Sequence, residues 1–131
     1  MTALLVLAGL GQLALAAGSL AIPRVLGWRE ETRKLARLTR QVFWTYAGYI
    51  WGTNVLMGAL SALAPALLLD GTPLARAVCG YVALYWGARL VIQLFWFDRS
   101  VATTPTLRLA DAALTALFLF LTATYGYVLA R

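Results

Sequence analysis

Residues 2–22 read TALLVLAGLGQLALAAGSLAI, a run without a single charged side chain. An α-helix needs about 20 mostly apolar residues to cross the hydrocarbon core of a bilayer, so this run predicts a membrane span. It also resembles the apolar part of a signal peptide, with small residues at positions 14 and 16–18. Signal peptides begin with positive charge, which residues 1–3 lack, and we therefore interpret the run as a retained first helix.

The composition of the whole chain agrees with this first helix. Of its 131 residues, 62% are hydrophobic and 12% are charged. Soluble domains are about 45–50% apolar and about 25% charged, so this composition is typical of a membrane protein. The length accommodates four spans with short connections. We predict an all-α integral membrane protein, a four-transmembrane-helix bundle that forms a single domain over residues 1–131.

The other three spans are expected at residues 41–66, 74–97 and 109–130. Pro65 is predicted to end or kink the second span, because proline cannot continue the helical hydrogen-bond ladder. The sequence Asp-Gly-Thr-Pro at residues 70–73 is typical of a turn. Residues 98–108 are predicted to form the last polar loop, between the third and fourth spans.

Basic residues concentrate between the first two spans, at Arg24, Arg29, Arg33, Lys34, Arg37 and Arg40. Pro23 is predicted to end the first helix just before this segment. Two structures remain open for residues 24–40. The segment is either a short amphipathic helix that lies in the membrane interface, or a charged extension of the second span.

The charge asymmetry predicts an orientation. With four spans, the segments 24–40 and 98–108 lie on one side and carry six plus two basic residues, whereas the opposite side carries only Arg76 and Arg131. Cytoplasmic loops of membrane proteins are enriched in Lys and Arg. We therefore expect both basic loops in the cytoplasm and both termini outside, in a bacterial-type inner (plasma) membrane.

Small and polar residues divide the second span into two faces. At 100° per residue one face holds Gln41, Thr45, Gly48, Tyr49 and Gly52, and the nearly opposite face holds Asn54, Gly58 and Ser61. Polar and small residues on a membrane helix mark contacts with protein. We predict that the second span has two protein neighbours, with Gly48 and Gly52 as a helix-packing motif.

The third span carries the most informative charge. Tyr81, Tyr85, Arg89 and Gln93 recur at every fourth position. Arg89 lies roughly 12 Å below the predicted cytoplasmic interface, where an unpartnered arginine costs at least ~2.5 kcal/mol. Asp111 of the fourth span lies at a similar depth. We predict that Arg89 and Asp111 form a bridge, either directly or through Gln93 and Tyr85.

This polar site has two interpretations. It is either a contact between helices alone, or a binding site for an anionic lipid head or a small anionic ligand, to which Asn54 adds an amide. The chain has no histidine, and its one cysteine, Cys79, lies in an apolar run and is interpreted as a small buried side chain. Without histidine or paired carboxylates we expect no metal, no cofactor and no catalytic residue.

The sequence therefore predicts a small, non-catalytic polytopic membrane protein. It is expected to act as an accessory or structural subunit that self-associates or joins a larger membrane complex, with membrane lipids and no nucleic acid as further partners. The alternative is a protein that binds or transports a hydrophobic or anionic small molecule or lipid, anchored at Arg89. A membrane enzyme is the third interpretation.

Overall fold

The computed structural model describes residues 1–97 and 104–131. The structure is 88% helical, and the described residues form no strand. The predicted all-α class is confirmed. The structure is dominated by the long helices α1 (Thr2–Ser19), α4 (Arg37–Leu63), α6 (Pro73–Val91) and α7 (Pro105–Ala130).

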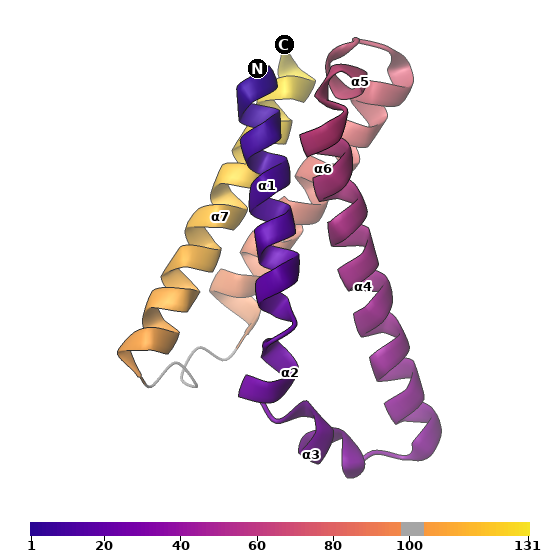
Figure 1. Cartoon of the computed structure of the whole chain (residues 1–131), viewed down its shortest axis with the longest axis vertical. Helices are drawn as coiled ribbons and strands as arrows, with labels where there is room; N and C mark the ends of the chain where they lie inside the picture. Colours follow the sequence, from indigo (N-terminus) through magenta and orange to yellow (C-terminus); the bar gives the residue numbers. More distant parts are fainter. Residues whose placement is uncertain (98–103) are drawn as a thin grey trace.

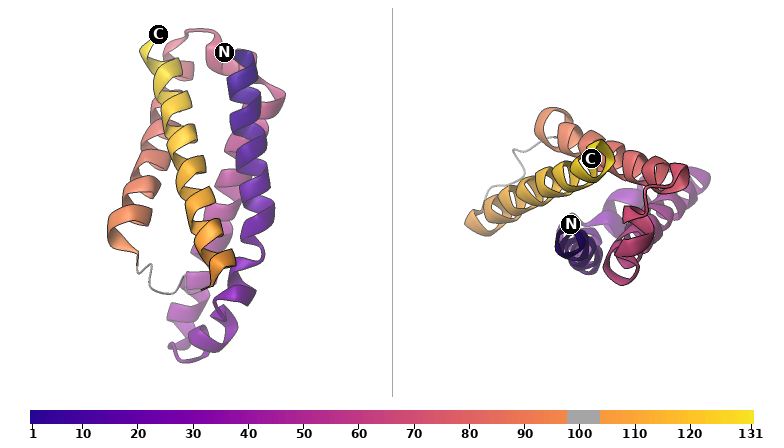
Figure 2. Two further views of the ribbon diagram at one scale, coloured as in Figure 1. Left: turned by 90° about the vertical axis from the view of Figure 1, so that its left-hand side faces the viewer. Right: turned by 90° about the horizontal axis from the view of Figure 1, so that it is seen from above.

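The long helices are arranged as two antiparallel pairs (Figure 1). Helix α1 packs along α4, and α6 packs along α7, while α1 also contacts α7 and so joins the two pairs. Figure 2 shows α7 running beside α1 and α6. Both chain termini lie at one end of the bundle, and the segment that connects α1 to α4 lies at the other end (Figure 1).

Within residues 1–97 and 104–131, three helical stretches are long and apolar enough to cross a membrane: Thr2–Val25, Pro73–Trp96 and Pro105–Ala130. They correspond to the first, third and fourth predicted spans. Helix α4, at 27 residues, is also long enough, but it starts with arginines and carries polar groups along both faces. Its composition therefore supports a span less directly than that of the other three.

The basic segment takes parts of both predicted structures. After α1 ends at Ser19, the short helices α2 (Ile22–Val25) and α3 (Trp28–Arg33) follow, and α4 begins at Arg37. Helix α3 is separate from α4, yet α4 does start before the predicted boundary. Gly27 has φ +65° between α2 and α3, a left-handed conformation that side chains disfavour.

The role predicted for Pro23 was wrong. It does not end the first helix, because α1 already ends at Ser19; it lies instead in the first turn of α2. The missing N–H of proline costs nothing in a first turn, where this group has no partner within the helix.

The end that holds the termini is built as predicted. Helix α4 ends at Leu63, and Pro65 begins the short helix α5 (Pro65–Leu69). The Asp70 carboxylate then accepts hydrogen bonds from the backbone N–H and the hydroxyl of Thr72, at 2.9 and 2.8 Å. The Thr72 hydroxyl oxygen in turn accepts from the N–H of Ala75 and caps α6.

The other end departs from the predicted boundaries. Helix α6 continues into a single π-helical turn, η1 (Ile92–Trp96). Helix α7 begins at Pro105, within the predicted loop 98–108, because Thr104 caps it by accepting a hydrogen bond from the N–H of Leu107 at 3.1 Å. Residues 98–103 of that loop lie outside the described part of the chain.

Close packing of α1 against α4 depends on two glycines. A Cβ atom placed on Gly9 would lie 2.5 Å from the backbone nitrogen of Ala62 and 2.6 Å from the carbonyl oxygen of Gly58. One placed on Gly58 would lie 3.0 Å from the carbonyl oxygen of Gly9. The two backbones are therefore in direct contact, as in other membrane helix pairs with small interfacial residues.

Candidate functional site

Side chains from all four long helices meet in one buried hydrogen-bond network. The members are Gln12 of α1, Ser61 of α4, Trp86 of α6 and Tyr125 of α7. The Gln12 amide donates to the Tyr125 hydroxyl at 2.7 Å, and its oxygen accepts from the Trp86 indole N–H at 3.1 Å. The hydroxyls of Tyr125 and Ser61 are also hydrogen-bonded to each other. We call these four residues the central network.

The central network joins the two helix pairs. Gln12 and Ser61 belong to one pair, and Trp86 and Tyr125 belong to the other, so three of its hydrogen bonds cross between the pairs. Each of the four residues is at most 1% exposed. Hydrogen bonds between membrane helices contribute about 0.6 kcal/mol on average and up to about 1.7. The network therefore specifies how the pairs align more than it adds stability.

A second polar group lies at the end of α6. The Arg89 guanidinium donates to the Gln93 side-chain oxygen at 3.1 Å, and the Gln93 amide donates to the Asp111 carboxylate at 2.6 Å. The guanidinium also lies over two aromatic rings, 4.8 Å from the centroid of Phe97 and 4.9 Å from that of Phe118. Arg89 is thus connected to Asp111 through Gln93.

The π turn explains how Phe97 reaches Arg89. The N–H of Phe97 bonds to the carbonyl of Ile92, five residues earlier, so the turn holds one residue more than an α-helical turn. In an uninterrupted α-helix, positions 89 and 97 would point about 80° apart, whereas one extra residue leaves them only about 20° apart. The π turn therefore places an aromatic ring against the guanidinium on the same face of the helix.

Two of the predicted residues form a separate contact. The Tyr85 hydroxyl donates to the Asn54 side-chain oxygen at 2.8 Å and so connects α6 to α4. Tyr81, one turn earlier in the predicted stripe, is 57% exposed. The structure therefore divides the predicted site: Arg89, Gln93 and Asp111 lie together, while Tyr85 and Asn54 form a second bridge.

In the described part of the chain, the predicted packing motif of α4 faces open space. A Cβ on Gly48 or on Gly52 would have nothing within 4 Å, in contrast to Gly9 and Gly58. The face of α4 that packs inside the bundle is the predicted face with Asn54, Gly58 and Ser61. Asn54 contacts α6, Gly58 contacts α1, and Ser61 contacts α7. Packing of Gly48 and Gly52 against a partner chain stays a prediction.

Sequence reasoning missed Gln12 and Gly9. Gln12 is an amide in the middle of an otherwise apolar run, and its polarity is a signal for an inward-facing position. No such signal marks Gly9, because the same run also contains Gly11 and Gly18. Which glycine lies at the helix contact depends on how α1 is rotated against α4.

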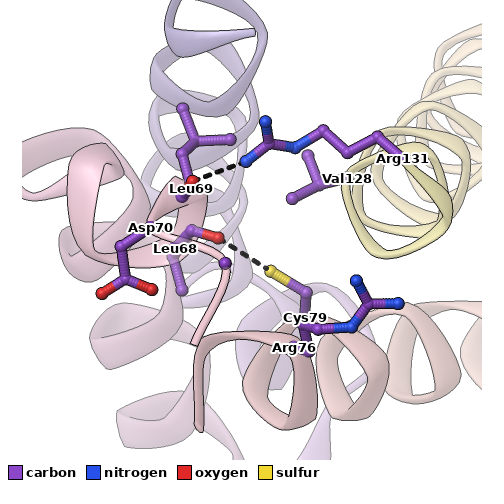
Figure 3. A pocket seen from close by; sticks show the side chains of 8 residues that line it. Leu68, Leu69, Asp70, Arg76, Cys79, Val128 and Arg131 are labelled. Carbon is purple, nitrogen blue, oxygen red and sulfur yellow. Dashed lines mark hydrogen bonds between the residues drawn. The ribbon is translucent and has the colours of Figure 1, made fainter. Parts of the chain in front are cut away.

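A cavity of about 420 Å³ lies at the end that holds the termini, lined in part by Asp70, Arg76 and Arg131 (Figure 3). The Arg131 guanidinium donates to the carbonyl of Leu69 at 2.6 Å. The Cys79 thiol donates to the carbonyl of Leu68 at 3.7 Å and is 1% exposed, which makes it part of the packing between α5 and α6. Hydrogen bonds from Thr72 hold the pKa of Asp70 below its ordinary value.

The polar groups of the central network interact with each other through hydrogen bonds. Among residues 1–97 and 104–131, no three His, Cys, Asp or Glu side chains gather where they could hold a metal ion. The central network consists of an amide, two hydroxyls and an indole, and it contains no carboxylate or imidazole to act as a base.

Comparisons with protein-family models, with curated proteins and with solved structures find no match.

Proposed function

We propose that this protein is a non-catalytic structural or accessory subunit of a membrane assembly, and that α4 crosses the membrane as its second span, beside α1, α6 and α7. Helix α4 packs along α1, and its Asn54 and Ser61 bond to α6 and α7. It therefore shares the depth of three helices that are apolar enough to cross a membrane. In this arrangement the termini lie outside and the basic segment before α4 lies in the cytoplasm of a bacterial-type inner membrane.

The observation that carries the proposal is the uncovered face of α4. Among residues 1–97 and 104–131, nothing lies within 4 Å of a Cβ placed on Gly48 or Gly52, and the neighbouring tyrosines Tyr46 and Tyr49 are 61% and 71% exposed. Small residues let backbones approach closely, and polar groups on a membrane helix are more stable against protein than against lipid tails. We therefore assign this face to a protein neighbour, either a second copy or another subunit.

The proposal is tested by cysteine crosslinking. Cys79→Ala removes the one native thiol, after which Gly48→Cys places a new thiol on the proposed face. Oxidation in membranes should link two copies through position 48. Gly126→Cys is the matched control, since Gly126 also has nothing within 4 Å of its Cβ but lies on α7.

Native mass spectrometry in mild detergent completes the test, because a different subunit would not be crosslinked. A Gly48→Leu variant should lose its partner, whether this is a copy or another protein, while Gly126→Leu should keep it. A strictly monomeric native protein without any co-purifying chain, together with absent crosslinking at position 48, would contradict the proposal.

The alternative function, binding of an anionic molecule or lipid at Arg89, has weaker support. The guanidinium already donates a hydrogen bond to Gln93 and lies over the rings of Phe97 and Phe118, so these contacts occupy part of the surface that a ligand would use. Arg89→Leu separates the two functions. The structural role predicts a less stable bundle, whereas the binding role predicts an intact bundle that no longer retains its ligand.

A further inference from the structure

A second cavity lies at the basic end of the bundle, between α3 and the start of α4. Its volume is about 400 Å³, and it is lined by Arg29, Thr32, Arg33, Arg40 and Trp44. Small-molecule sites occupy about 300–1,000 Å³, so the cavity has the size of a small ligand or headgroup. Three of these five residues are arginines, and none of the described residues that line the cavity carries a carboxylate.

Aromatic contacts hold this cavity in shape. Trp28 of α3 packs edge-on against Phe43 and Trp44 of α4, with ring centroids 4.9 and 5.9 Å apart. Thr32, which is 5% exposed, donates to the carbonyl of Trp28 at 2.6 Å and stabilises the last turn of α3. Helix α3 is therefore docked on α4 through its own side chains, and the arginines project from a defined surface.

The charges around the cavity are incompletely neutralised. Arg33 pairs with Glu30 at 3.1 Å, and the second carboxylate of α3, on Glu31, pairs with Lys34 instead. Within the described ranges 1–97 and 104–131, Arg29 and Arg40 form no ion pair. The guanidinium groups of Arg29, Arg33 and Arg40, together with the Glu30 carboxylate that pairs with Arg33, carry a net charge of +2. Like charges facing one space repel each other, and a bound anion relieves that repulsion.

The position of the cavity indicates where such an anion comes from. It lies at the end opposite the termini, where α3 crosses below the bundle (Figure 1). Tryptophan side chains such as Trp44 are enriched at the level of lipid headgroups. Arginine binds phosphate oxygens through two parallel hydrogen bonds, and basic pockets on the cytoplasmic side of membrane helices take phosphorylated lipid heads.

We propose that Arg29, Arg33 and Arg40, with Trp44 as the apolar wall, form a binding site for a phosphate-bearing group with two negative charges, presented by a membrane lipid headgroup. A headgroup with two phosphodiesters matches the net charge of +2, whereas one with a single phosphodiester leaves one guanidinium unpaired. The named residues all belong to one chain, so this proposal does not depend on the proposed subunit role.

The experiment measures lipid binding to the purified, delipidated protein by native mass spectrometry. The probes are cardiolipin, phosphatidylglycerol and phosphatidylcholine, which carry net charges of about −2, −1 and 0, and inorganic pyrophosphate as a free diphosphate. Cardiolipin should bind at least tenfold more tightly than phosphatidylglycerol. Displacement of cardiolipin by millimolar pyrophosphate would assign the site to free phosphate groups and overturn its assignment to a lipid.

A pair of double variants distinguishes a built site from diffuse attraction. Arg29→Gln/Arg40→Gln removes two charges from the cavity, and Arg24→Gln/Arg37→Gln removes two charges from the same segment outside it. The first variant should lose at least tenfold in cardiolipin affinity, and the control less than threefold. Equal losses in the two variants, or no preference for cardiolipin in the native protein, would overturn the proposal.

A third variant separates binding from folding. Arg29→Lys/Arg40→Lys keeps the charge but removes the two-pronged hydrogen bonding, so it should bind with intermediate affinity. Thermal unfolding without added lipid should be alike in all variants, because these arginines are exposed or half-buried and lie outside the core. A Lys variant that binds as tightly as the native protein would show that only charge is recognised and would contradict a shaped phosphate site.

Discussion

Replacing Gly9 by alanine should disrupt the contact between α1 and α4. The new methyl carbon would lie 2.5 Å from a backbone nitrogen and 2.6 Å from a backbone oxygen, whereas ordinary contacts begin at about 3.4 Å. Backbone atoms cannot rotate away as a side chain can, so the helices must separate locally by roughly 0.9 Å, the difference between 3.4 and 2.5 Å.

This separation has a calculable cost. A radial gap of about 0.5–1 Å forfeits a quarter to a half of the dispersion energy of the atoms that face it, and overpacked sites lose typically about 1–3 kcal/mol. At a position with free space, the same substitution stabilises a helix by about 0.5–1 kcal/mol. Gly126→Ala is such a control, because its Cβ would meet nothing within 4 Å. The two variants should therefore differ by about 1.5–4 kcal/mol in unfolding free energy.

The assay is unfolding in mixed micelles with increasing SDS, followed by tryptophan fluorescence. Gly9→Ala should unfold at a lower SDS fraction than the native protein, and Gly126→Ala at the same or a higher fraction. If Gly9→Ala is as stable as Gly126→Ala, the two backbones do not touch at this position. That result would refute the close contact of α1 with α4 at Gly9.

Three further predictions test other contacts. Tyr125→Phe removes the hydroxyl that connects Gln12 to Ser61 and should lower the unfolding free energy by about 1 kcal/mol in the same SDS assay. The control Tyr127→Phe changes a side chain that is 60% exposed and should leave the unfolding free energy unchanged. Equal effects of the two variants would contradict the central network. Asp70 has a pKa below its ordinary value of 3.8, so its contribution to stability is present above pH 3.8 and is lost as the pH falls through the lower pKa of the folded state. Asp70→Asn should therefore make the unfolding free energy less dependent on pH below about 4. An unchanged pH profile would contradict the hydrogen-bonded turn between Asp70 and Thr72. The Cys79 thiol, at 1% exposure, should react with a maleimide only after unfolding, and rapid labelling of the native protein would contradict the packing of α5 on α6.

The helix class and two of the helix breaks were predictable because they depend on neighbours in sequence. Apolar length predicted the stretches that the structure contains at Thr2–Val25, Pro73–Trp96 and Pro105–Ala130. Local chemistry predicted the break at Pro65 and the turn at Asp70. Pro23 was misjudged, because a proline is compatible both with the end of one helix and with the first turn of the next.

The polar contacts were predictable only in part. The spacing of four residues between Arg89 and Gln93 indicated that they share a helix face. The antiparallel order of the third and fourth spans indicated that Asp111 lies at a similar depth. The structure places Gln93 between the two charged groups. The π turn that brings Phe97 over Arg89 has no signature in the spacing of polar residues. Sequence spacing assumes a constant helical period, and the π turn changes it.

The sequence by itself determined that the chain is helical, that it contains stretches long and apolar enough to cross a membrane, and where along the chain its basic residues gather. Only the tertiary structure decided which glycines lie between helices and which polar groups form the central network. Gly9 and Gly48 look equally suited to helix packing, yet one meets a backbone and the other meets nothing. The reason is that apolar length and charge are properties of one helix, whereas a contact also requires the rotation and depth of its neighbour.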